Sequence, residues 1–409
     1  MAAKELRVAI VGAGISGLTT AIALRQRGIG ATVFERADQL REVGAAVALA
    51  ANATRLLDRL GLGDPLSAVS AEASELIFRS WLDGRRISAH PVGEVYRNRF
   101  GAPFYGVHRG DLLDILANAW GRELVHVGHN LTGLREARKA IVLEFEDGTE
   151  FPSDLVVGAD GIHSTVRRYV TTEGGPVYTC TSGFRGLVPL AAVPLLPDPQ
   201  ALQFWMGPGA HLVHYAICDG RVNFLAVLDG PQKWSAGANA APAAPDELAA
   251  RFADWHPAVR QLVNAVPQGP CWALLSQPPL RLWSRGQAVL IGDAAHAMLP
   301  HHGQGANQAI EDAVVLAECL ASVSIGGHRE AFDRYQRLRR TRTRAIQRSS
   351  WDTSPLLHLP DGPAAIARDM DLNRLVERFG WIHAYDAQKM HKPDMTRILN
   401  DHLHRPDAK

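Results

Sequence analysis

A glycine-rich turn near the N-terminus most strongly constrains the fold of this chain. The apolar run 6–11 suits a short buried parallel strand, and Gly12-Ala13-Gly14-Ile15-Ser16-Gly17 follows it directly. In such a turn the first glycine permits a tight bend, the second lets the backbone approach a pyrophosphate, and the third lets helix and strand pack closely. A helical pattern and a second strand at 31–34 complete a βαβ unit. The sequence therefore predicts a Rossmann-type dinucleotide-binding domain.

Two charged residues follow the second predicted strand. Glu35 lies near the roughly 20-residue spacing at which an acidic residue meets a ribose hydroxyl. Arg36 suits the 2′-phosphate of NADPH. The alternative is a solvated arginine near the adenosine. These residues indicate a dinucleotide site without distinguishing FAD from NAD.

Two further motifs follow apolar runs much later in the chain. Asp160-Gly161 follows the run 155–159, and Asp293 follows the run 288–292. Ligands of open α/β sheets bind beyond the carboxyl ends of the strands, so Asp293 is placed to accept a hydrogen bond from a ribityl hydroxyl of FAD. Asp160 has a similar placement, although a strand-end aspartate can instead cap the next helix.

The loop after Pro300 is rich in small residues. Gly303, Gly305 and Ala306 would let the backbone touch an isoalloxazine ring, and the helix that follows has a dipole that favours negative charge on a reduced flavin. We therefore expect the loop to contact the flavin.

In this order the three motifs resemble the class A, single-component FAD-dependent aromatic hydroxylases. The resemblance is to the group of salicylate hydroxylase, 3-hydroxybenzoate 6-hydroxylase and 6-hydroxynicotinate 3-monooxygenase, and it covers essentially the full length. It is carried by the segments 11–18, 108–112, 157–167, 283–286, 290–312 and 381–386.

The resemblance implies an α/β fold with α+β inserts, the p-hydroxybenzoate hydroxylase fold. The expected FAD-binding segments are 1–73, 101–180 and 281–330, the expected segments of an antiparallel substrate sheet are 74–100 and 181–280, and residues 331–409 form a C-terminal helical region. The implied reaction uses FAD, O2 and NADH or NADPH, with NADH favoured, and hydroxylates a small phenolic or amino-aromatic carboxylic acid through a flavin C4a-hydroperoxide. Ring position and the identity of the acid stay open.

The resemblance also extends the expected cofactor site. It implies a flavin role for Arg109, and we further assign Ile15, Ser16, Val47, Ala48, Leu131 and Asn307 to the FAD site. The segment 44–52 departs from the family pattern GAGIxLxPNA, because Ala46 and Ala51 replace a glycine and a proline. It contains no histidine, so a covalent flavin link through histidine is not expected there.

Candidate catalytic residues lie on a predicted strand and in the loop after Pro300. His211 and Tyr215 are four residues apart, so both lie on one face of a strand, roughly 13 Å apart at about 3.3 Å per residue. By the resemblance His211 is the base that deprotonates the substrate, since imidazole titrates near neutral pH; the alternative is a histidine satisfied within the sheet. His301 is expected to orient the substrate, with His302 or Gln304 as alternatives.

A neighbouring predicted strand supplies two further candidates. Gln203 and Trp205 alternate in the pattern that would line a substrate pocket, although an aromatic residue in a sheet more often belongs to the core.

Composition and charge limit the classes of binding partner that the sequence supports. The net charge of +1, with 46% hydrophobic residues, predicts neither a nucleic-acid nor a membrane partner. The arginine-rich stretch 333–348 is interpreted as a solvated, salt-bridged helix. Four cysteines without CxxC spacing predict no metal site and no disulfide framework. A cytoplasmic monomer or homodimer is expected.

Three alternatives remain at this stage. One is a flavoprotein hydroxylase of a larger biosynthetic aromatic scaffold. A halogenase is disfavoured, because the chain has no WxWxIP segment. From a different class, a flavin-binding regulator without catalysis would share the same motifs.

Overall fold

The computed structural model describes residues 6–40, 46–138, 140–234, 239–244, 246–266, 269–323 and 326–389. Outside this range lie residues 1–5, 41–45, 139 and 324–325 of the expected FAD-binding segments, which include the first two residues of the segment 44–52. Residues 235–238, 245 and 267–268 of the expected substrate-sheet segment and the last twenty residues of the expected C-terminal region also lie outside it.

The nucleotide-binding part is built on a six-stranded sheet with the order β19-β20-β12-β1-β2-β8. All pairs except β19–β20 are parallel, and the sheet consists of β1 (Val8–Val11), β2 (Ala31–Phe34), β8 (Val125–His126), β12 (Leu155–Gly158), β19 (Ser284–Arg285) and β20 (Ala288–Leu290). Helix α1 (Ile15–Arg25) packs against α10 (Gly305–Ala321) beside it. The Rossmann-type expectation is confirmed.

A second sheet of eight strands has the order β17-β18-β13-β16-β15-β14-β5-β6. Its strands are β5 (Glu75–Ser80), β6 (Arg86–Pro91), β13 (Val177–Pro189), β14 (Leu202–Gly207), β15 (Ala210–Ile217), β16 (Arg221–Asp229), β17 (Ala240–Ala241) and β18 (Cys271–Ser276). Only the β14–β5 pair is parallel. The β15–β16 hairpin turns at Asp219 and Gly220, both with positive φ, which matches the type I′ turn that Asp-Gly favours.

Smaller elements connect the two sheets. One three-stranded sheet joins β3 (Ala46–Leu49), β7 (Tyr105–His108) and β4 (Ser70–Glu72), and another joins β9 (Leu131–Ala137), β10 (Ala140–Phe145) and β11 (Glu150–Ser153). The helices here are α2 (Ala51–Arg59), α3 (Gly63–Ala68), α4 (Gly93–Phe100), α5 (Arg109–Trp120), α6 (Thr165–Val170), α7 (Glu247–Arg251), α8 (Pro257–Asn264) and α9 (Asp293–His296), with 3-10 turns η1 (Arg122–Leu124), η2 (Leu190–Ala192) and η3 (Pro300–His302).

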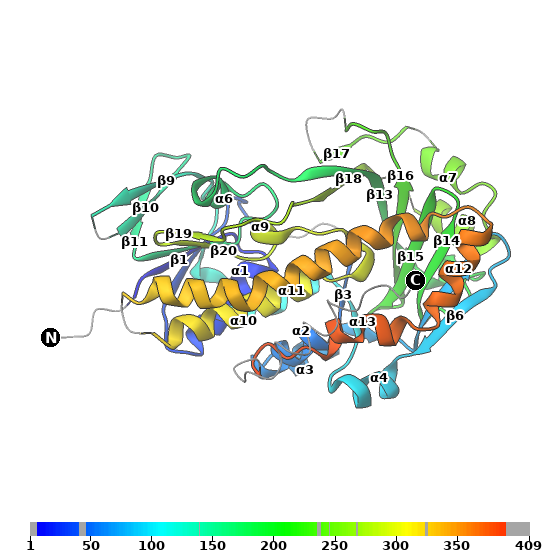
Figure 1. The fold of residues 1–409 in the computed structure, drawn as a ribbon, viewed down its shortest axis with the longest axis horizontal. Helices are drawn as coiled ribbons and strands as arrows, with labels where there is room; N and C mark the ends of the chain where they lie inside the picture. Colours follow the sequence, from blue (N-terminus) through cyan, green and yellow to red (C-terminus); the bar gives the residue numbers. More distant parts are fainter. Residues whose placement is uncertain are drawn as a thin grey trace.

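The long helix α11 (His328–Leu357) crosses the molecule from the nucleotide-binding part to the eight-stranded sheet (Figure 1). It packs on α10 and on η3, and α12 (Pro363–Leu372) and α13 (Leu375–Ala384) follow it. Because α12 contacts β6 and α13 contacts α2 and α4, the C-terminal helices close the space between the two sheets.

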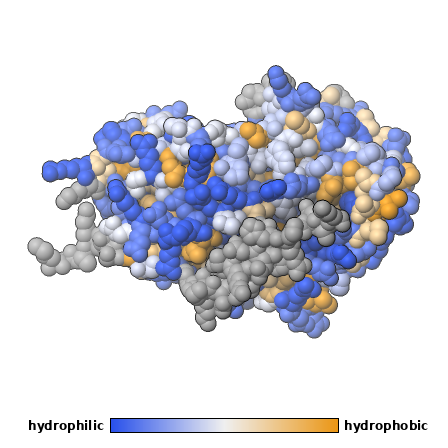
Figure 2. Space-filling model, in the orientation of Figure 1, coloured by the Kyte–Doolittle hydropathy of each residue, from blue (hydrophilic) through white to orange (hydrophobic). Residues whose placement is uncertain are grey.

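The helix α11 contains the arginine-rich stretch 333–348, and its structure corrects the expectation that this stretch is solvated throughout. Much of the molecular face along this helix is hydrophilic (Figure 2), as a solvated helix would be. Arg339 and Arg342, however, are 0% and 1% exposed and pair with Glu311 and Asp312 of α10. The stretch is therefore only partly solvated, because two of its arginines neutralise buried carboxylates. Within the described residues no helix is long and apolar enough to cross a membrane.

Candidate active site

The three glycine and aspartate motifs meet at one cavity of about 1780 Å³ between the two sheets. Its nucleotide-binding side is lined by Gly14, Ile15, Ser16, Val47, Ala48, Arg109, Ala159, Gly161, Asp293, Gly303, Gly305 and Ala306. Segments separated by more than a hundred residues therefore form one wall, because the strand ends that precede them are neighbours in the parallel sheet.

The glycines of the first turn have separate roles. A Cβ on Gly12, whose φ is +102°, would lie 2.4 Å from the Ala159 carbonyl oxygen, and one on Gly17 would lie 1.8 Å from the Gly12 carbonyl oxygen. A Cβ on Gly14 would have no atom of the described residues within 4 Å beyond its own chain neighbours. The first and third glycines therefore allow strands and helix to pack, whereas Gly14 leaves open the space beside the α1 N-terminus, where a pyrophosphate fits.

Glu35 and Ser16 also suit a dinucleotide. The Glu35 carboxylate accepts hydrogen bonds from the Ala13 and Ala37 backbone N–H groups at 2.9 and 3.0 Å, so it is held at the turn while still half-buried. The Ser16 hydroxyl is buried without a hydrogen-bond partner among the described residues. Such an orphaned donor beside a helix N-terminus fits a phosphate oxygen. Arg36 is exposed at the end of β2.

The two motif aspartates are placed differently. Asp160 is half-buried, and its carboxylate accepts hydrogen bonds from Thr165 N, Val166 N and the Ser164 hydroxyl. It therefore caps α6, which is the alternative considered above, and burial raises the pKa of its carboxyl group. Asp293 is exposed and lines the cavity, with its Oδ1 about 4.0 Å from where a Cβ on Gly305 would lie.

Asn307 ties β3 to the loop after Pro300. Its amide donates to the Ala48 and Gly303 carbonyl oxygens at 2.9 and 2.7 Å, and its Oδ1 accepts from Ala50 N at 2.8 Å. The side chain is fully buried. Asn307 therefore holds the backbone of two cavity segments rather than reaching the cavity itself.

Two expected contacts lie away from the cavity. Leu131 is a core residue at the start of β9. Gln304 is 1% exposed, and its Oε1 accepts from Asn52 and Gln308 in a polar cluster that also contains Glu311. Gln304 is therefore committed to holding α2 against α10.

The eight-stranded sheet presents alternate residues to the cavity. One row across neighbouring strands consists of Arg185, Leu225, Val213, Phe204 and Phe78, all of which line the cavity.

Gln203 and Trp205 face the other way, which corrects the expected orientation of β14. Gln203 donates to the Pro197 and Asp198 carbonyl oxygens and accepts from Arg79. Trp205 is 0% exposed in the second core and stacks on His256. Both faces of this sheet are buried, so residue alternation alone does not reveal which face meets the cavity.

Tyr215 lies in the cavity wall where the eight-stranded sheet meets β7 and Arg109 of the nucleotide-binding side. Burial raises the pKa of its phenol, and the positive charges of Arg185 and Arg109 oppose that shift. Both arginines also line the cavity. This corner can therefore bind an anionic group while Tyr215 donates a hydrogen bond to it.

His211 shares the face of Tyr215, as predicted, but it does not line the cavity. It pairs across the sheet with Met206 and Val227 and is 1% exposed. Its ring lies 5.2 Å from that of His301, centroid to centroid, and its Nδ1 lies 2.7 Å from His358 Nε2. His211 is therefore covered by two other histidines.

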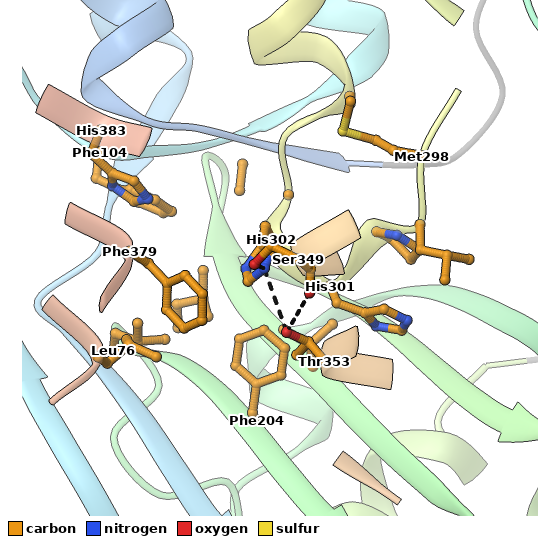
Figure 3. Close-up of a pocket in the computed structure, with 18 of the residues that line it drawn as sticks. Leu76, Phe104, Phe204, Met298, His301, His302, Ser349, Thr353, Phe379 and His383 are labelled. Carbon is orange, nitrogen blue, oxygen red and sulfur yellow. Dashed lines mark hydrogen bonds between the residues drawn. The ribbon is translucent and has the colours of Figure 1, made fainter. Parts of the chain in front are cut away.

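His301 and His302 occupy the loop between the flavin side and the sheet, with Met298 before them in the chain and Phe204 of β14 facing them across the cavity (Figure 3). Both ring nitrogens of His301 lack a hydrogen-bond partner among the described residues, and burial lowers its pKa to about 3. His302 Nε2 lies 2.9 Å from the Ser349 hydroxyl, and burial lowers its pKa to about 4. Of the two neutral rings, His301 keeps a nitrogen available.

His383 was not singled out from the sequence. It lines the cavity beside Phe104 (Figure 3), and its Nδ1 lies 2.7 Å from the Tyr96 hydroxyl oxygen, within hydrogen-bond distance. Tyr96 in turn accepts from Ala51 N at 3.0 Å. The segment 381–386 had carried the family resemblance, and this was the available signal.

Comparison with known proteins agrees with this geometry. A model of the FAD binding domain matches residues 5–350. The chain is 38% identical over 390 residues to 3-amino-4-hydroxybenzoate 2-monooxygenase of Streptomyces cremeus, covering 95% of this chain and 97% of that protein. It is 33% identical to 6-hydroxynicotinate 3-monooxygenase of Pseudomonas fluorescens, covering 85% and 91%.

Among solved structures, Klebsiella pneumoniae HpxO complexed with FAD and uric acid superposes with a TM-score of 0.80 at 25% identity, covering 97% of this chain and 95% of that one. Among the described residues, the open space at Gly14, the Ser16 hydroxyl without a hydrogen-bond partner and the cavity-facing Asp293 all fit the cofactor of that family. The chain belongs to the FAD binding domain family, and its cofactor is FAD.

Proposed function

We propose that this protein is an NAD(P)H-dependent flavin monooxygenase that uses O2 to hydroxylate a small phenolic or amino-aromatic carboxylic acid. The observation that carries the proposal is the cavity itself, which joins the FAD-binding turn and Asp293 to a wall holding Tyr215, Arg109 and Arg185. An aromatic ring fits between the apolar residues of that wall, and a carboxylate or phenolate fits the arginines.

The relatives support the substrate class. Those at 38% and 33% identity are named for an aminohydroxybenzoate and a hydroxynicotinate, which are both small aromatic acids carrying a hydroxyl group. Bound FAD supplies the activated oxygen. The protein's own residues orient the ring, exclude water and remove the proton of the phenol.

The remaining assignments rest on the same cavity. We assign Tyr215 and His301 as groups that contact the substrate, with His302 at the far side of the same loop. NADH is the favoured reductant. We propose a monomer or homodimer in the cytoplasm, with neither nucleic acid nor membrane as a partner.

A larger aromatic substrate is the second candidate. The cavity volume of about 1780 Å³ exceeds the roughly 300–1,000 Å³ of a typical ligand site, even though FAD takes part of it. Leu356, Leu372, Leu375, Val376 and Phe379 of the C-terminal helices line its outer part. An apolar extension on the aromatic ring would fit between them.

The test is a substrate screen with purified protein. Bound flavin should colour it yellow, and one of 3-amino-4-hydroxybenzoate, 6-hydroxynicotinate, salicylate and 3-hydroxybenzoate should stimulate NADH oxidation and give a product that carries one oxygen atom from isotopically labelled O2, with or without loss of CO2, by mass spectrometry. Turnover only with an alkyl-substituted aromatic acid would favour the second candidate. Flavin binding without turnover of any aromatic acid would leave the non-catalytic regulator.

A further inference from the structure

A chain of buried hydrogen bonds leads away from the cavity behind His301. His211 Nδ1 lies 2.7 Å from His358 Nε2, and His358 Nδ1 lies 2.5 Å from Asp229 Oδ1. His211 and His358 are 1% and 6% exposed, whereas the Asp229 side chain is 58% exposed. The chain therefore connects a buried imidazole to solvent.

The three members come from separate elements. His211 lies on β15, Asp229 ends the neighbouring strand β16, and His358 caps the C-terminus of α11. Burial lowers the pKa of the His358 imidazole, while Asp229 and the dipole of α11, whose C-terminal end His358 caps, favour positive charge on it. Arg251 of α7 opposes it, and His211 and His301 are the other titratable groups that face this ring from the sheet and the loop.

The gap between His211 and His301 is one that a hydrogen bond can span. Their ring centroids are 5.2 Å apart, and the hydrogen-bonded rings of His211 and His358 are 5.0 Å apart. Both ring nitrogens of His301 lack a hydrogen-bond partner among the described residues, so no existing bond holds the ring away from His211.

We propose that His211, His358 and Asp229 form a proton relay that carries the substrate's hydroxyl proton from His301 to solvent. The proposal rests on the proposed function, because hydroxylation requires an ionised phenol. His301 contacts the substrate, and His211 and His358 are positioning residues that act through it.

The proton balance is complete without any redox step. The phenol O–H bond breaks and an N–H bond forms on His301. A proton then passes to His211, which releases its Nδ1 proton to His358 Nε2, and the resulting imidazolium is paired with Asp229 until water takes the proton from Asp229 or His358. Burial lowers the pKa of His211 well below its ordinary value, so its ring is a neutral link that holds no charge for long.

The relay can be tested by His358→Gln in the FAD-loaded, full-length protein. Glutamine keeps a hydrogen-bonding group of similar length. Unlike an imidazole, its amide cannot take up a proton on one atom and release a proton from another. His328→Gln is the matched control, because it makes the same change at the first residue of the same helix, at the end opposite His358, where the ring packs against Phe332.

The first measurement is a stopped-flow pH jump from about pH 6 to about pH 8, across the ordinary imidazole pKa. The reporter is bound 4-hydroxy-3-nitrobenzoate, whose phenolate absorbs visibly. His358→Gln should slow ionisation of this bound phenol by roughly tenfold or more at unchanged probe affinity and FAD content, and His328→Gln should match the wild type. Asp229→Asn, at the exposed end, should slow it less. Equal rates in wild type and His358→Gln would overturn the relay.

The second measurement is the pH profile of product formation with the substrate found in the screen. The defect of His358→Gln should shrink as the pH rises, because hydroxide then replaces the relay. A defect of the same size at every pH would mean that His358 is merely structural. If His358→Gln does not fold, the pH jump is measured on Asp229→Asn instead. Ionisation of the bound phenol at the wild-type rate in that variant would refute the relay. A wild-type protein that forms no product refutes the proposed function, while the pH jump still tests the relay.

Discussion

Gly14→Ala separates cofactor binding from folding in this protein. Within the part of the chain that the structure describes, a Cβ at Gly14 would meet no atom within 4 Å, but it would enter the space beside the α1 N-terminus. The apoprotein should therefore lose at most about 1 kcal/mol, since alanine is a poorer N-cap than glycine. FAD should lose about one charge-assisted hydrogen bond from the backbone, roughly 1.5–3 kcal/mol. This corresponds to a dissociation constant raised by roughly ten- to 150-fold.

The assay is a titration of the deflavinated protein with FAD, followed by flavin fluorescence, beside thermal unfolding of the apoprotein. Gly17→Ala is the counterpart, because its Cβ would lie 1.8 Å from the Gly12 carbonyl oxygen. Backbone cannot yield easily, so this variant should lose about 3 kcal/mol or more of stability even without FAD. Wild-type FAD affinity in Gly14→Ala would refute the assignment of that space to the pyrophosphate.

Three other predictions concern the cavity and the buried charges. Tyr215→Phe should slow hydroxylation roughly tenfold or more while FAD affinity stays unchanged, as product analysis and flavin titration would reveal; full activity would exclude the hydroxyl from catalysis. Arg342→Met should lower the free energy of unfolding by about 3 kcal/mol, because it strips Glu311 of a 2.8 Å ion pair, and adding Glu311→Gln should restore part of the urea midpoint; no loss in the single variant would contradict this account. Burial lowers the pKa of both His214 and His383 to about 3, so the unfolded chain binds their protons first as the pH falls below about 6.5. Each of these two histidines should therefore lower the free energy of unfolding by about 1.4 kcal/mol for every unit that the pH falls between about pH 6 and pH 3. Urea midpoints that do not change with pH in this window would argue against neutral buried rings.

The sequence by itself determined the fold class and the cofactor. Strand, turn and helix N-terminus are consecutive in each motif, so the groups that face FAD are specified within a few residues of one another. Gly14 and Asp293 lie in the cavity wall for that reason. Local patterns were sufficient because a phosphate or ribityl site is built largely from backbone at strand ends.

The same local reasoning was insufficient where two roles share one pattern. Asp160 follows a buried strand as Asp293 does, but its carboxylate caps α6. A strand buried on both faces shows no preference in its alternation, so only packing placed Phe204 toward the cavity and Trp205 in the core.

Tertiary structure alone decided the environment of the titratable side chains. His211 is covered by His301 and His358, which come from segments 90 and 147 positions away along the chain, and Arg342 is buried because Glu311 faces it from another helix. Burial and charge pairing depend on which distant segments pack together, and one-dimensional spacing does not contain that information. The sequence thus specified the FAD site. The packing of α11 against the loop after Pro300 and the end of the sheet decided that His301 meets the cavity and that His211 and His358 lie behind it.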